Sequence, residues 1–359
     1  MSKKVAVIGS GIAGLCVGAR LAAEGFNVSL FEANSYAGGK VTVLEASGFR
    51  FDAGPSLFTL PELLDDTFKA CGRNPKEYYN YRKWPVACQY FWEDGTRLTA
   101  WGDNRRFARE VEKVLGVPSR DVLDYLKNAA RVYETTTPIF LEKSLHKLST
   151  YFSKDILKAF KSLGRLHLNT SLHQLNEDKL PHPHLTQLFD RFATYNGSSP
   201  YLTPGVMATI SHLEHNLGTY YPKGGIYTVT KSLVRLCEEM GVNFHFNERV
   251  EEIICKDDIV KGVQTHKRNF EADIVISNMD VVPSYRKLLP KAKAPEKTLR
   301  QERSSSALIF YWGISRSFKS LDLHNILFSE NYQQEFKTIF KEADIFDDPT
   351  VYINISSKV

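Results

Sequence analysis

Three glycines near the start of the chain have the spacing of a dinucleotide-binding loop. They lie in Gly9-Ser10-Gly11-Ile12-Ala13-Gly14. The first glycine permits a tight turn, the second lets the backbone approach a pyrophosphate, and the third lets a helix pack against a strand. The N–H groups and the dipole of that helix then hold the anion. The alternative interpretation is an ordinary glycine turn.

The segments on both sides of the loop are those that a dinucleotide site requires. Residues 4–8 form a short apolar run, typical of a buried parallel strand, and residues 12–23 have the apolar period of a helix. Residues 27–31 are predicted as a second strand, which ends at Glu32. A carboxylate there accepts hydrogen bonds from ribose hydroxyls and disfavours the 2′-phosphate of NADP, unless Glu32 is only a solvated side chain at a strand tip.

The remaining chain shows two kinds of pattern. From about residue 62 to 215 it is rich in predicted helices, interrupted by a strand at 87–92, and we interpret this part as an inserted substrate domain. The β/α rhythm then returns in a helix at 225–240, a strand at 243–246, a hairpin of strands at 251–255 and 259–265, and a strand at 272–277. A mixed stretch follows residue 283, and residues 351–355 are predicted as a strand. The nucleotide-binding domain is therefore predicted to be discontinuous in sequence.

Length and composition limit the classes of protein that this chain can be. With 359 residues, of which 43% are hydrophobic, it exceeds the size at which one core usually stops growing, so we expect two domains. Its 46 basic and 41 acidic residues give a net charge of +5 without dense basic runs, which argues against a nucleic-acid partner. No stretch is long and apolar enough to predict a spanning helix.

The spacing of cysteines and histidines predicts neither disulfides nor a metal site. The five cysteines form no C-x-x-C pair and are odd in number, which favours reduced thiols in the cytoplasm. The histidines of His212-Leu213-Glu214-His215 and of His182-Pro183-His184 lack a clear third and fourth ligand. A Gly-x-Ser-x-Gly motif is missing, so hydrolysis is not supported.

The segments downstream of Glu32 distinguish FAD from NAD. Gly38-Gly39-Lys40 is followed by Gly48-Phe49-Arg50-Phe51-Asp52-Ala53-Gly54-Pro55. The run from Val5 to Pro55 resembles the flavin amine oxidase superfamily, and residues 51–62 resemble its bacterial carotenoid (phytoene-type) desaturase branch. The resemblance implies that the paired glycines and Lys40 contact flavin phosphates, and that the Gly-Pro segment passes beside the isoalloxazine ring. Glycines let N–H groups face an anion, and lysine adds a point charge; without the resemblance, this is a plain turn.

Three later segments fit the same branch. Residues 221–227 resemble its P-x-G-G element, residues 248–253 suggest that the Val250 backbone bonds the adenine, and residues 272–280 resemble the strand and loop that lead to the substrate domain. The alternatives are a Pro/Gly turn and an ordinary strand. The predicted FAD contacts are Gly9, Gly11, Ile12, Ala13, Gly14, Glu32, Ala33, Gly38, Gly39, Lys40, Gly54, Pro55, Ser56, Val250 and Asn278.

The predicted fold is α/β, with a Rossmann-like FAD-binding domain and an inserted α+β substrate domain. We predict the FAD-binding domain at 1–65 and 216–282, and the substrate domain at 66–215 and 283–359. The family closes with a glycine-rich segment and a helix that cover the flavin ribityl and phosphate. This sequence stops before such a segment, so we expect the C-terminal FAD segment to be missing from the chain and the substrate domain to be truncated.

The resemblance implies an FAD-dependent desaturase that removes hydrogen from carbon-carbon single bonds of a carotenoid. Ser56-Leu57-Phe58-Thr59-Leu60-Pro61 and Tyr78-Tyr79-Asn80-Tyr81 are closer to hydroxycarotenoid 3,4-desaturases than to phytoene desaturases. The motifs mark the cofactor, so no catalytic residue is assigned. The alternatives are a flavin amine oxidase and a non-enzymatic prenyl or lipid carrier of the Rab GDP-dissociation inhibitor type. The sequence predicts no oligomeric state and no electron acceptor.

Residues 140–168 combine apolar side chains at helical spacing with a lysine-rich opposite face. This pattern suits a helix that lies on an anionic membrane, and equally a helix that covers its own core. Because a carotenoid is delivered from lipid, the resemblance favours the membrane. We therefore expect a cytoplasmic protein, peripheral to the inner face of the cytoplasmic membrane.

Overall fold

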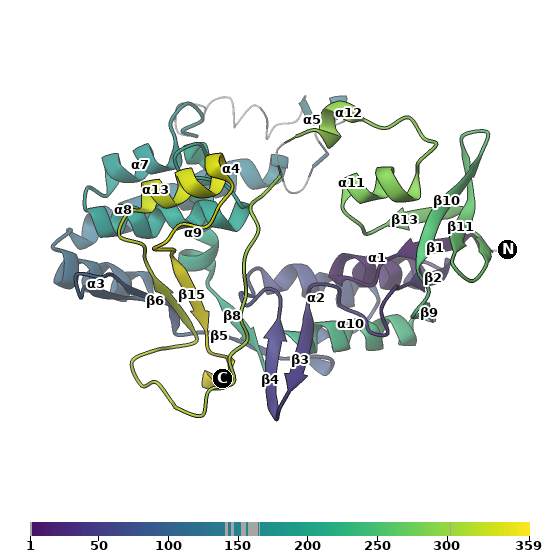
Figure 1. Ribbon diagram of the computed structural model, residues 1–359, viewed down its shortest axis with the longest axis horizontal. Helices are drawn as coiled ribbons and strands as arrows, with labels where there is room; N and C mark the ends of the chain where they lie inside the picture. The colour runs from purple at the N-terminus through teal and green to yellow at the C-terminus, as the bar shows by residue number, and fades with distance from the viewer. Residues whose placement is uncertain are drawn as a thin grey trace. The chain divides into compact units, whose positions relative to one another are not determined.

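The computed structural model describes residues 2–140, 143–144, 147–151, 156, 164, 166–301 and 303–359. The chain forms two compact units (Figure 1). Unit 1 consists of residues 1–82, 220–302 and 359, and unit 2 consists of residues 83–219 and 303–358. Both units are therefore assembled from separated stretches of sequence. This arrangement confirms the predicted α/β fold with a discontinuous Rossmann-like domain.

Unit 1 is built on a parallel sheet in the strand order β13-β1-β2-β9. Its strands are β1 (Lys4–Ile8), β2 (Asn27–Phe31), β9 (Asn243–His245) and β13 (Ile274–Ser277). Val5 and Val7 pack in the same core as helices α1 (Ile12–Ala23), α2 (Pro61–Ala70) and α10 (Tyr227–Glu239). Ala6 and Ile8 belong to a different core. Since successive side chains of a strand alternate between faces, both faces of this sheet are covered.

The second face of the unit 1 sheet is covered by an antiparallel sheet in the order β10-β11-β12. Its strands are β10 (Val250–Lys256), β11 (Ile259–Thr265) and β12 (Asn269–Glu271). Asp257 and Asp258 both have positive φ angles, 52° and 57°, as required by a tight hairpin turn. The predicted hairpin around these two residues is confirmed.

Two further strand pairs were not predicted. Strands β3 (Thr42–Ala46) and β4 (Phe49–Ala53) form a hairpin, and β5 (Tyr81–Lys83) pairs with β8 (Tyr220–Pro222). The turn between β3 and β4 is Ser47-Gly48, with φ angles of 51° and 80°, again the backbone of a tight hairpin. The β3–β4 hairpin immediately follows the Gly38-Gly39 turn, so it connects two segments of the predicted FAD site.

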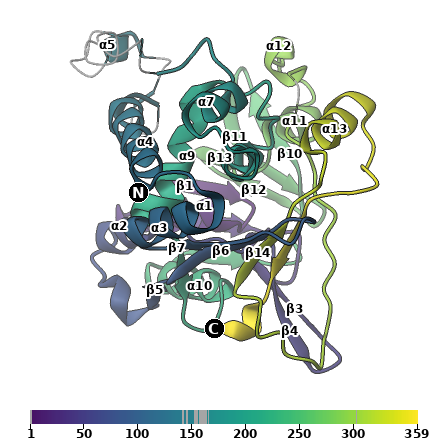
Figure 2. The ribbon, with the colours of Figure 1, turned by 90° about the vertical axis from the view of Figure 1, so that its left-hand side faces the viewer.

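Unit 2 contains a mixed sheet in the order β15-β14-β6-β7, of which Figure 2 labels β14, β6 and β7. Its strands are β6 (Val86–Phe91), β7 (Arg97–Trp101), β14 (His324–Leu327) and β15 (Val351–Asn354). Helices pack on one face and bury a core that includes Tyr90, Leu98 and Ile326. The helices of this unit are α3 (Asn104–Leu115), α4 (Ser119–Phe140), α5 (Leu148–Tyr151), α7 (Leu172–Lys179), α8 (Pro183–Asp190), α9 (Thr209–His212) and α13 (Tyr332–Lys337).

Short helical segments complete both units. Unit 1 has α11 (Val281–Pro283) and α12 (Glu296–Leu299), together with one-turn segments at Pro75–Glu77 and Ser284–Leu288. Unit 2 has such segments at Arg191–Asn196, Gly205–Ala208, Leu213–Leu217, Thr338–Glu342 and Ser356–Lys358. Most of the stretch 140–168, where we predicted an amphipathic helix, lies outside the described residues. Within the described part of the chain, no helix is long and apolar enough to cross a membrane.

The boundaries of the units differ from the predicted domain boundaries. The first boundary lies after residue 82 rather than after residue 65, because Leu64, Phe68 and Tyr79 are buried in the same core as α1 and α10. The last lies after residue 302 rather than 282, because Leu288 packs with the strands of unit 1. The return to unit 1 comes at residue 220 instead of 216, where β8 begins.

A buried ion pair lies among the helices of unit 2. Arg191 bonds Glu214, and their side chains are 7% and 3% exposed. Arg191 Nε also donates to the Tyr90 hydroxyl at 2.9 Å, and the Tyr195 hydroxyl donates to Glu214. Both charges are therefore paired and hydrogen-bonded, which is the condition under which buried charges are tolerated.

His215 follows Glu214 and is almost fully buried. Its ring stacks on Phe107 with a centroid distance of 4.6 Å, and neither ring nitrogen has a hydrogen-bond partner among the described residues. Burial lowers the pKa of His215 to about 4. The folded protein therefore holds this imidazole in its neutral form down to a pH at which the unfolded chain is already protonated.

Replacing His215 with phenylalanine is expected to make unit 2 more tolerant of acid. In the unaltered chain, stability falls as the pH drops from about 6.5 to about 4, because the unfolded state binds the proton and the folded state does not. The lost stability amounts to at most about 3 kcal/mol. We expect the free energy of unfolding in urea to fall less for His215→Phe than for the unaltered chain between about pH 7 and pH 5. The exposed His266→Gln is the control, and an equal loss in His215→Phe and the unaltered chain would contradict the assignment.

Candidate functional site

The glycine loop between β1 and α1 is closed by backbone contact. A Cβ atom on Gly14 would lie 2.1 Å from the carbonyl oxygen of Gly9, and Gly9 itself has a φ of 93°. Gly11 is the N-cap residue of α1, and no side chain in the described part of the chain caps the helix. The first helical hydrogen bond runs from Leu15 N to Gly11 O at 2.9 Å. The N–H groups that precede it are oriented out of the helix end, where an anion is stabilised.

Glu32, at the carboxyl end of β2, holds this loop. Its side chain is buried, and Oε2 accepts hydrogen bonds from Ser10 N at 3.0 Å and Ser10 Oγ at 2.7 Å. Oε1 accepts from Asn34 N at 2.9 Å and Asn34 Nδ2 at 3.0 Å. These bonds use the four lone-pair positions of a carboxylate. A ribose hydroxyl would therefore have to replace one of the two mobile side-chain donors, the Ser10 hydroxyl or the Asn34 amide.

The Gly38-Gly39 turn lies directly against the loop. Gly38 N donates to Ser10 O at 2.8 Å, and a Cβ on Gly39 would approach the Cα of Gly11 to 3.2 Å. A Cβ on Gly54 would lie 1.8 Å from the carbonyl oxygen of Lys40. Three glycine-containing segments that are separate in sequence thus meet through backbone contacts, which only glycine permits at these distances.

Asn278, at the carboxyl end of β13, contacts the loop from the other side. Its N–H donates to Ile8 O at 2.9 Å, and its side-chain amide Nδ2 donates to Gly9 O at 3.4 Å. The same Nδ2 lies 2.9 Å from the position of a Cβ on Gly11 and 3.0 Å from that on Gly14. The carboxyl ends of β1, β2 and β13 therefore converge, as expected for the ligand-binding edge of a parallel sheet.

The other predicted contacts occupy varied surroundings. Ile12 and Ala13 form the first turn of α1, and Ala33 is exposed beside Glu32. Val250 begins β10, and its side chain is buried with Ala6 and Ile8, so the side chain serves the core. Lys40, Pro55 and Ser56 follow the two glycine turns on the chain. Their contacts to the flavin, and that of the Val250 backbone to the adenine, stay predictions.

Asp52 is a positioning residue that the sequence did not reveal. Its side chain is only 4% exposed. Oδ2 accepts from the Tyr221 hydroxyl at 2.6 Å and from Ile226 N at 2.8 Å, and Arg50 Nη2 donates to Oδ1 at 3.2 Å. A Cβ on Gly225 would lie 2.7 Å from both carboxylate oxygens. Asp52 therefore fixes the start of α10 against β4, and the available signal was a carboxylate between Phe51 and Ala53 in this strand.

Helix α10 in turn supports the Gly38 turn. Thr230 Oγ1 donates to Val41 O at 2.8 Å, and a Cβ on Gly38 would meet the Thr230 side chain at 2.8 Å. The P-x-G-G-like segment at 221–227 contacts the β3–β4 hairpin through Asp52, and the helix that follows contacts the turn through Thr230. The elements that the resemblance grouped together are brought together by the fold.

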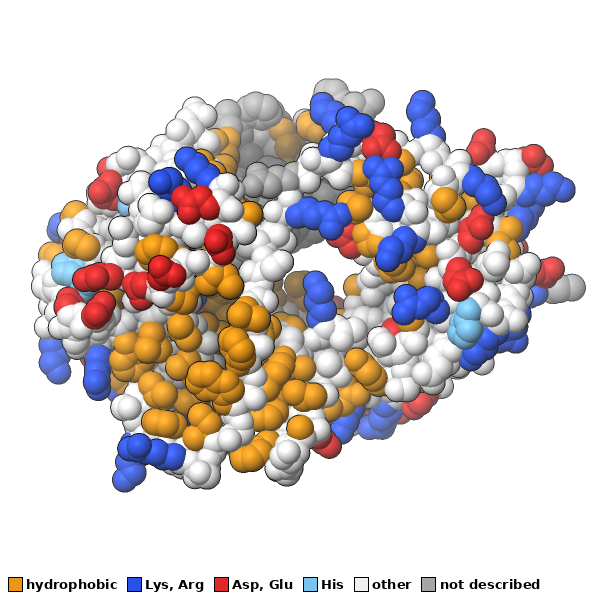
Figure 3. Space-filling view, in the orientation of Figure 1, with side chains coloured by type: hydrophobic (Ala, Val, Ile, Leu, Met, Phe, Trp, Pro, Cys, Tyr) orange, Lys and Arg blue, Asp and Glu red, His pale blue; other side chains and the backbone are white. Residues whose placement is uncertain are grey.

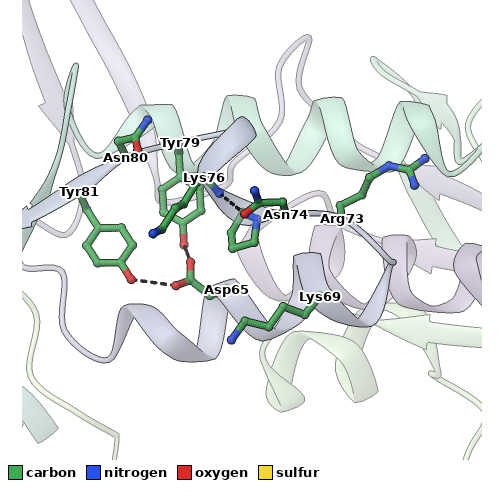
Figure 4. Close-up of a pocket in the computed structure, with 9 residues that line it drawn as sticks. Asp65, Lys69, Arg73, Asn74, Lys76, Tyr79, Asn80 and Tyr81 are labelled. Carbon is green, nitrogen blue, oxygen red and sulfur yellow. Dashed lines mark hydrogen bonds between the residues drawn. The ribbon is translucent and has the colours of Figure 1, made fainter.

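A separate pocket of about 470 Å³ lies beside α2 (Figure 4). There Asp65 accepts hydrogen bonds from the hydroxyls of Tyr79 and Tyr81, the latter at 2.8 Å. Burial, followed by the bond to Asp65, raises the pKa of both phenols, so both remain protonated donors. The Tyr78-Tyr79-Asn80-Tyr81 segment is therefore part of the packing of unit 1, and none of the predicted FAD contacts lines this pocket.

The residues 12–310 match the family described as flavin containing amine oxidoreductase. The chain belongs to this family. It is 53% identical over 356 residues to the 1-hydroxycarotenoid 3,4-desaturase of Flavobacterium sp. (strain P99-3), which covers 99% of this chain and 72% of that protein. It is 33% identical over 359 residues to the phytoene desaturase of Cercospora nicotianae, covering 98% of this chain and 57% of that protein.

A solved structure supports the fold. The oxidoreductase from Methanosarcina mazei superimposes with a TM-score of 0.55 at 18% identity, over 82% of this chain and 63% of the other. The chain thus spans less than two thirds of that protein's length, and between 57% and 72% of the two sequence relatives. At this level of identity, the likeness to the solved structure concerns the fold alone.

Membership of a flavin-containing family confirms the prediction of FAD. The geometry fits this cofactor: an uncapped helix end and three close glycine turns suit a pyrophosphate, and Glu32 and Asn278 lie at the same edge. When bound, FAD supplies the ability to accept a hydride. For a metal, the described residues contain no group of three or more candidate ligands, and Glu214 of the His212–His215 segment pairs with Arg191 instead.

Replacing Gly11 with alanine is expected to weaken FAD binding without unfolding unit 1. Its φ is −64°, and an added Cβ would meet only the Asn278 amide nitrogen, at 2.9 Å. The methyl group would, however, stand where the backbone approaches the pyrophosphate, so we expect Kd for FAD to rise about 10-fold or more. Flavin fluorescence titration measures this change.

The matched control for that variant is Gly18→Ala, on the same helix. A Cβ there makes ordinary contacts, 3.6 Å from Leu30 Cδ1, and alanine favours the helix by about 0.5–1 kcal/mol. FAD affinity should stay unchanged in this control. Equal affinities of Gly11→Ala and the unaltered chain would remove Gly11 from the predicted cofactor site.

Replacing Asp52 with asparagine is expected to destabilise unit 1. An asparagine amide has one acceptor oxygen, whereas both oxygens of Asp52 accept hydrogen bonds. At least one of the present donors would therefore face the amide NH2 group, which should lower the free energy of unfolding by about 1–3 kcal/mol. Thermal unfolding should show a lower midpoint. Tyr221→Phe removes one hydrogen bond and should cost about 1 kcal/mol; a larger loss for Tyr221→Phe than for Asp52→Asn would refute the central position of the carboxylate.

Proposed function

We propose that this chain carries the FAD-binding part of a carotenoid desaturase, of the hydroxycarotenoid 3,4-desaturase type. The observation that carries the proposal is 53% identity, over 99% of the chain, to a protein named 1-hydroxycarotenoid 3,4-desaturase. The reaction class is the removal of hydrogen from a carbon-carbon single bond by an FAD-dependent oxidoreductase. An intact dinucleotide loop in unit 1 supports this class, because the hydride that leaves the substrate must be accepted by a bound cofactor.

The contribution of the protein to this reaction divides between its residues. The Gly9–Gly14 loop and the first turn of α1 bind the pyrophosphate, Glu32 and Asn278 fix the loop, and Asp52 orients the start of α10. Unit 2 supplies an apolar sheet face of the kind that a polyene requires. We assign no proton acceptor to the chain.

The sequence also fits two other activities, and the comparisons favour the desaturase over both. A flavin amine oxidase shares the family, but the two sequence relatives above are named for carotenoids, one at 53% identity. A prenyl or lipid carrier without flavin would not need the glycine loop. In this loop a Cβ on Gly14 would lie 2.1 Å from the carbonyl oxygen of Gly9, so position 14 requires glycine, as in a dinucleotide site. Fold alone does not choose among these activities.

We also propose that the protein acts at the inner face of the cytoplasmic membrane. A carotenoid substrate is dissolved in lipid, so an enzyme that receives it gains from a membrane-bound position. The lysine-rich apolar stretch at 140–168 has the composition of a segment that binds anionic lipid surfaces. Its structure lies outside the described residues, and the proposal rests on its sequence.

The proposed activity is tested with FAD-reconstituted protein on liposomes that contain a 1-hydroxycarotenoid, under anaerobic conditions. We expect the visible flavin absorbance to bleach as the carotenoid gains a double bond, which shifts its absorption to longer wavelength. Gly11→Ala, which is expected to bind FAD more weakly, should reduce both changes at limiting FAD, and Gly18→Ala should retain both. Bleaching by amines and not by carotenoids would instead support the amine oxidase, and failure of the unaltered protein to bind flavin would support the carrier.

A further inference from the structure

The sheet of unit 2 has one covered face and one apolar face that is partly open. Tyr90, Leu98 and Ile326 point into the helical core. The neighbours of these residues along each strand alternate to the opposite face. Pairing aligns them in rows: Phe91 lies opposite Arg97 and Leu327, and Leu327 lies opposite Val351.

Apart from Arg97, this outer row is apolar, and it remains partly exposed. Leu327 is 40% exposed and Val351 is 44% exposed, and Phe91 is partly buried under the Arg97 guanidinium, 5.7 Å from its ring centroid. Hydrophobic side chains gather over this part of unit 2 in Figure 3. An exposed apolar patch of this kind marks a binding surface.

The next row of the same face contains one polar atom without a partner. Gln89 lies opposite Thr99 in β7 and Asn325 in β14. Its carbonyl oxygen Oε1 is buried and has no hydrogen-bond partner among the described residues. The neighbouring Asn325 is different, since its Oδ1 accepts from Asp322 N at 2.9 Å and its Nδ2 donates to Asp322 O at 2.7 Å.

A buried acceptor without a donor is unfavourable, and a ligand that supplies one donor removes the cost. The two rows are about 7 Å apart, because they are separated by two residues along each strand. A ligand that matches them is apolar over most of its length and has one hydroxyl at its end. A protein partner would bring many backbone N–H and C=O groups to this face, and the two rows have few side-chain donors or acceptors to bond them.

We propose that this face of unit 2 binds the hydroxyl-bearing end of a 1-hydroxycarotenoid. The substrate hydroxyl donates to Gln89 Oε1, while Phe91, Leu327 and Val351 contact the adjoining hydrocarbon. This inference rests on the proposed function, and it identifies the residue that distinguishes hydroxylated carotenoids from those without the hydroxyl. Gln89 is a specificity residue and takes no part in the hydrogen removal.

The test compares Gln89→Leu with the unaltered FAD-reconstituted protein. Equilibrium binding is measured by quenching of tryptophan fluorescence with two carotenoids of the same chain length, one with the 1-hydroxyl and one without it. We expect Gln89→Leu to bind the hydroxylated carotenoid about 3- to 10-fold more weakly, the value of one neutral hydrogen bond, and to bind the other carotenoid at least as well as before. Its melting temperature should not fall, because the variant removes an unpaired buried atom.

The matched control is Leu327→Ala on the outer row, which should weaken binding of both carotenoids by the same factor. The inference would be overturned if Gln89→Leu changed the binding of both carotenoids equally or of neither. It would also be overturned if the unaltered protein bound neither carotenoid. If the unaltered protein distinguishes the two carotenoids, Gln89→Leu does not, and neither protein desaturates them, the binding site is supported and the proposed function is refuted. If the unaltered protein desaturates the carotenoids but does not distinguish them in binding, the proposed function is supported and the binding site is refuted.

Discussion

Close backbone contact at the carboxyl ends of β1, β2 and β13 is the constraint on which unit 1 depends. The carbonyl oxygen of Gly9 occupies the place of any side chain at position 14, and the carbonyl of Lys40 does the same at position 54. Glycine at these positions lets the loop, the helix end and the following turns approach each other. The uncapped N–H groups of α1 are thereby exposed at the edge of the sheet, where an anion binds most favourably. A side chain at either position would separate these elements.

Hydrogen bonds from distant parts of the chain hold this contact in place. Asn278 bonds the carbonyl of Gly9, 269 positions earlier in the sequence, and Glu32 bonds Ser10 from the neighbouring strand. Asp52 and Thr230 connect α10 to the β3–β4 hairpin and to the Gly38 turn. Loop backbone has no ladder partner of its own, so side chains must satisfy it. The cofactor site of this flavin-containing family is therefore a property of the whole unit.

Unit 2 is organised by a different requirement. Its helices bury one face of the sheet around a paired arginine and glutamate, and this pairing permits charge inside the core. The other face keeps apolar side chains partly exposed. Because the helices cover only one face of the sheet, the folded domain can present apolar side chains on the other face. Unit 1 thus contains the predicted cofactor site of this flavin-containing family, and the apolar face of unit 2 is the surface that we propose for the substrate.

The sequence by itself determined the local elements. β1, α1 and β2 were predicted with the bounds that the structure shows, because an apolar run, a helical period and a glycine turn are all encoded by adjacent residues. The hairpin at Asp257 and Asp258 was predicted for the same reason. The segments of the glycine site were also evident from sequence, although their mutual contacts were not.

Only the tertiary structure decided which of these segments meet and which polar groups are buried. Strand β14 pairs between β6 and β15, and helix α2 joins the core of unit 1; both contacts join residues that no local pattern connects. Asp52 and Gln89 are residue types that are common on protein surfaces. In the structure, however, the Asp52 carboxylate is fully hydrogen-bonded, and the Gln89 side-chain carbonyl oxygen has no partner among the described residues. Burial and hydrogen bonding depend on neighbours far away in the chain, so they arise only when the chain has folded.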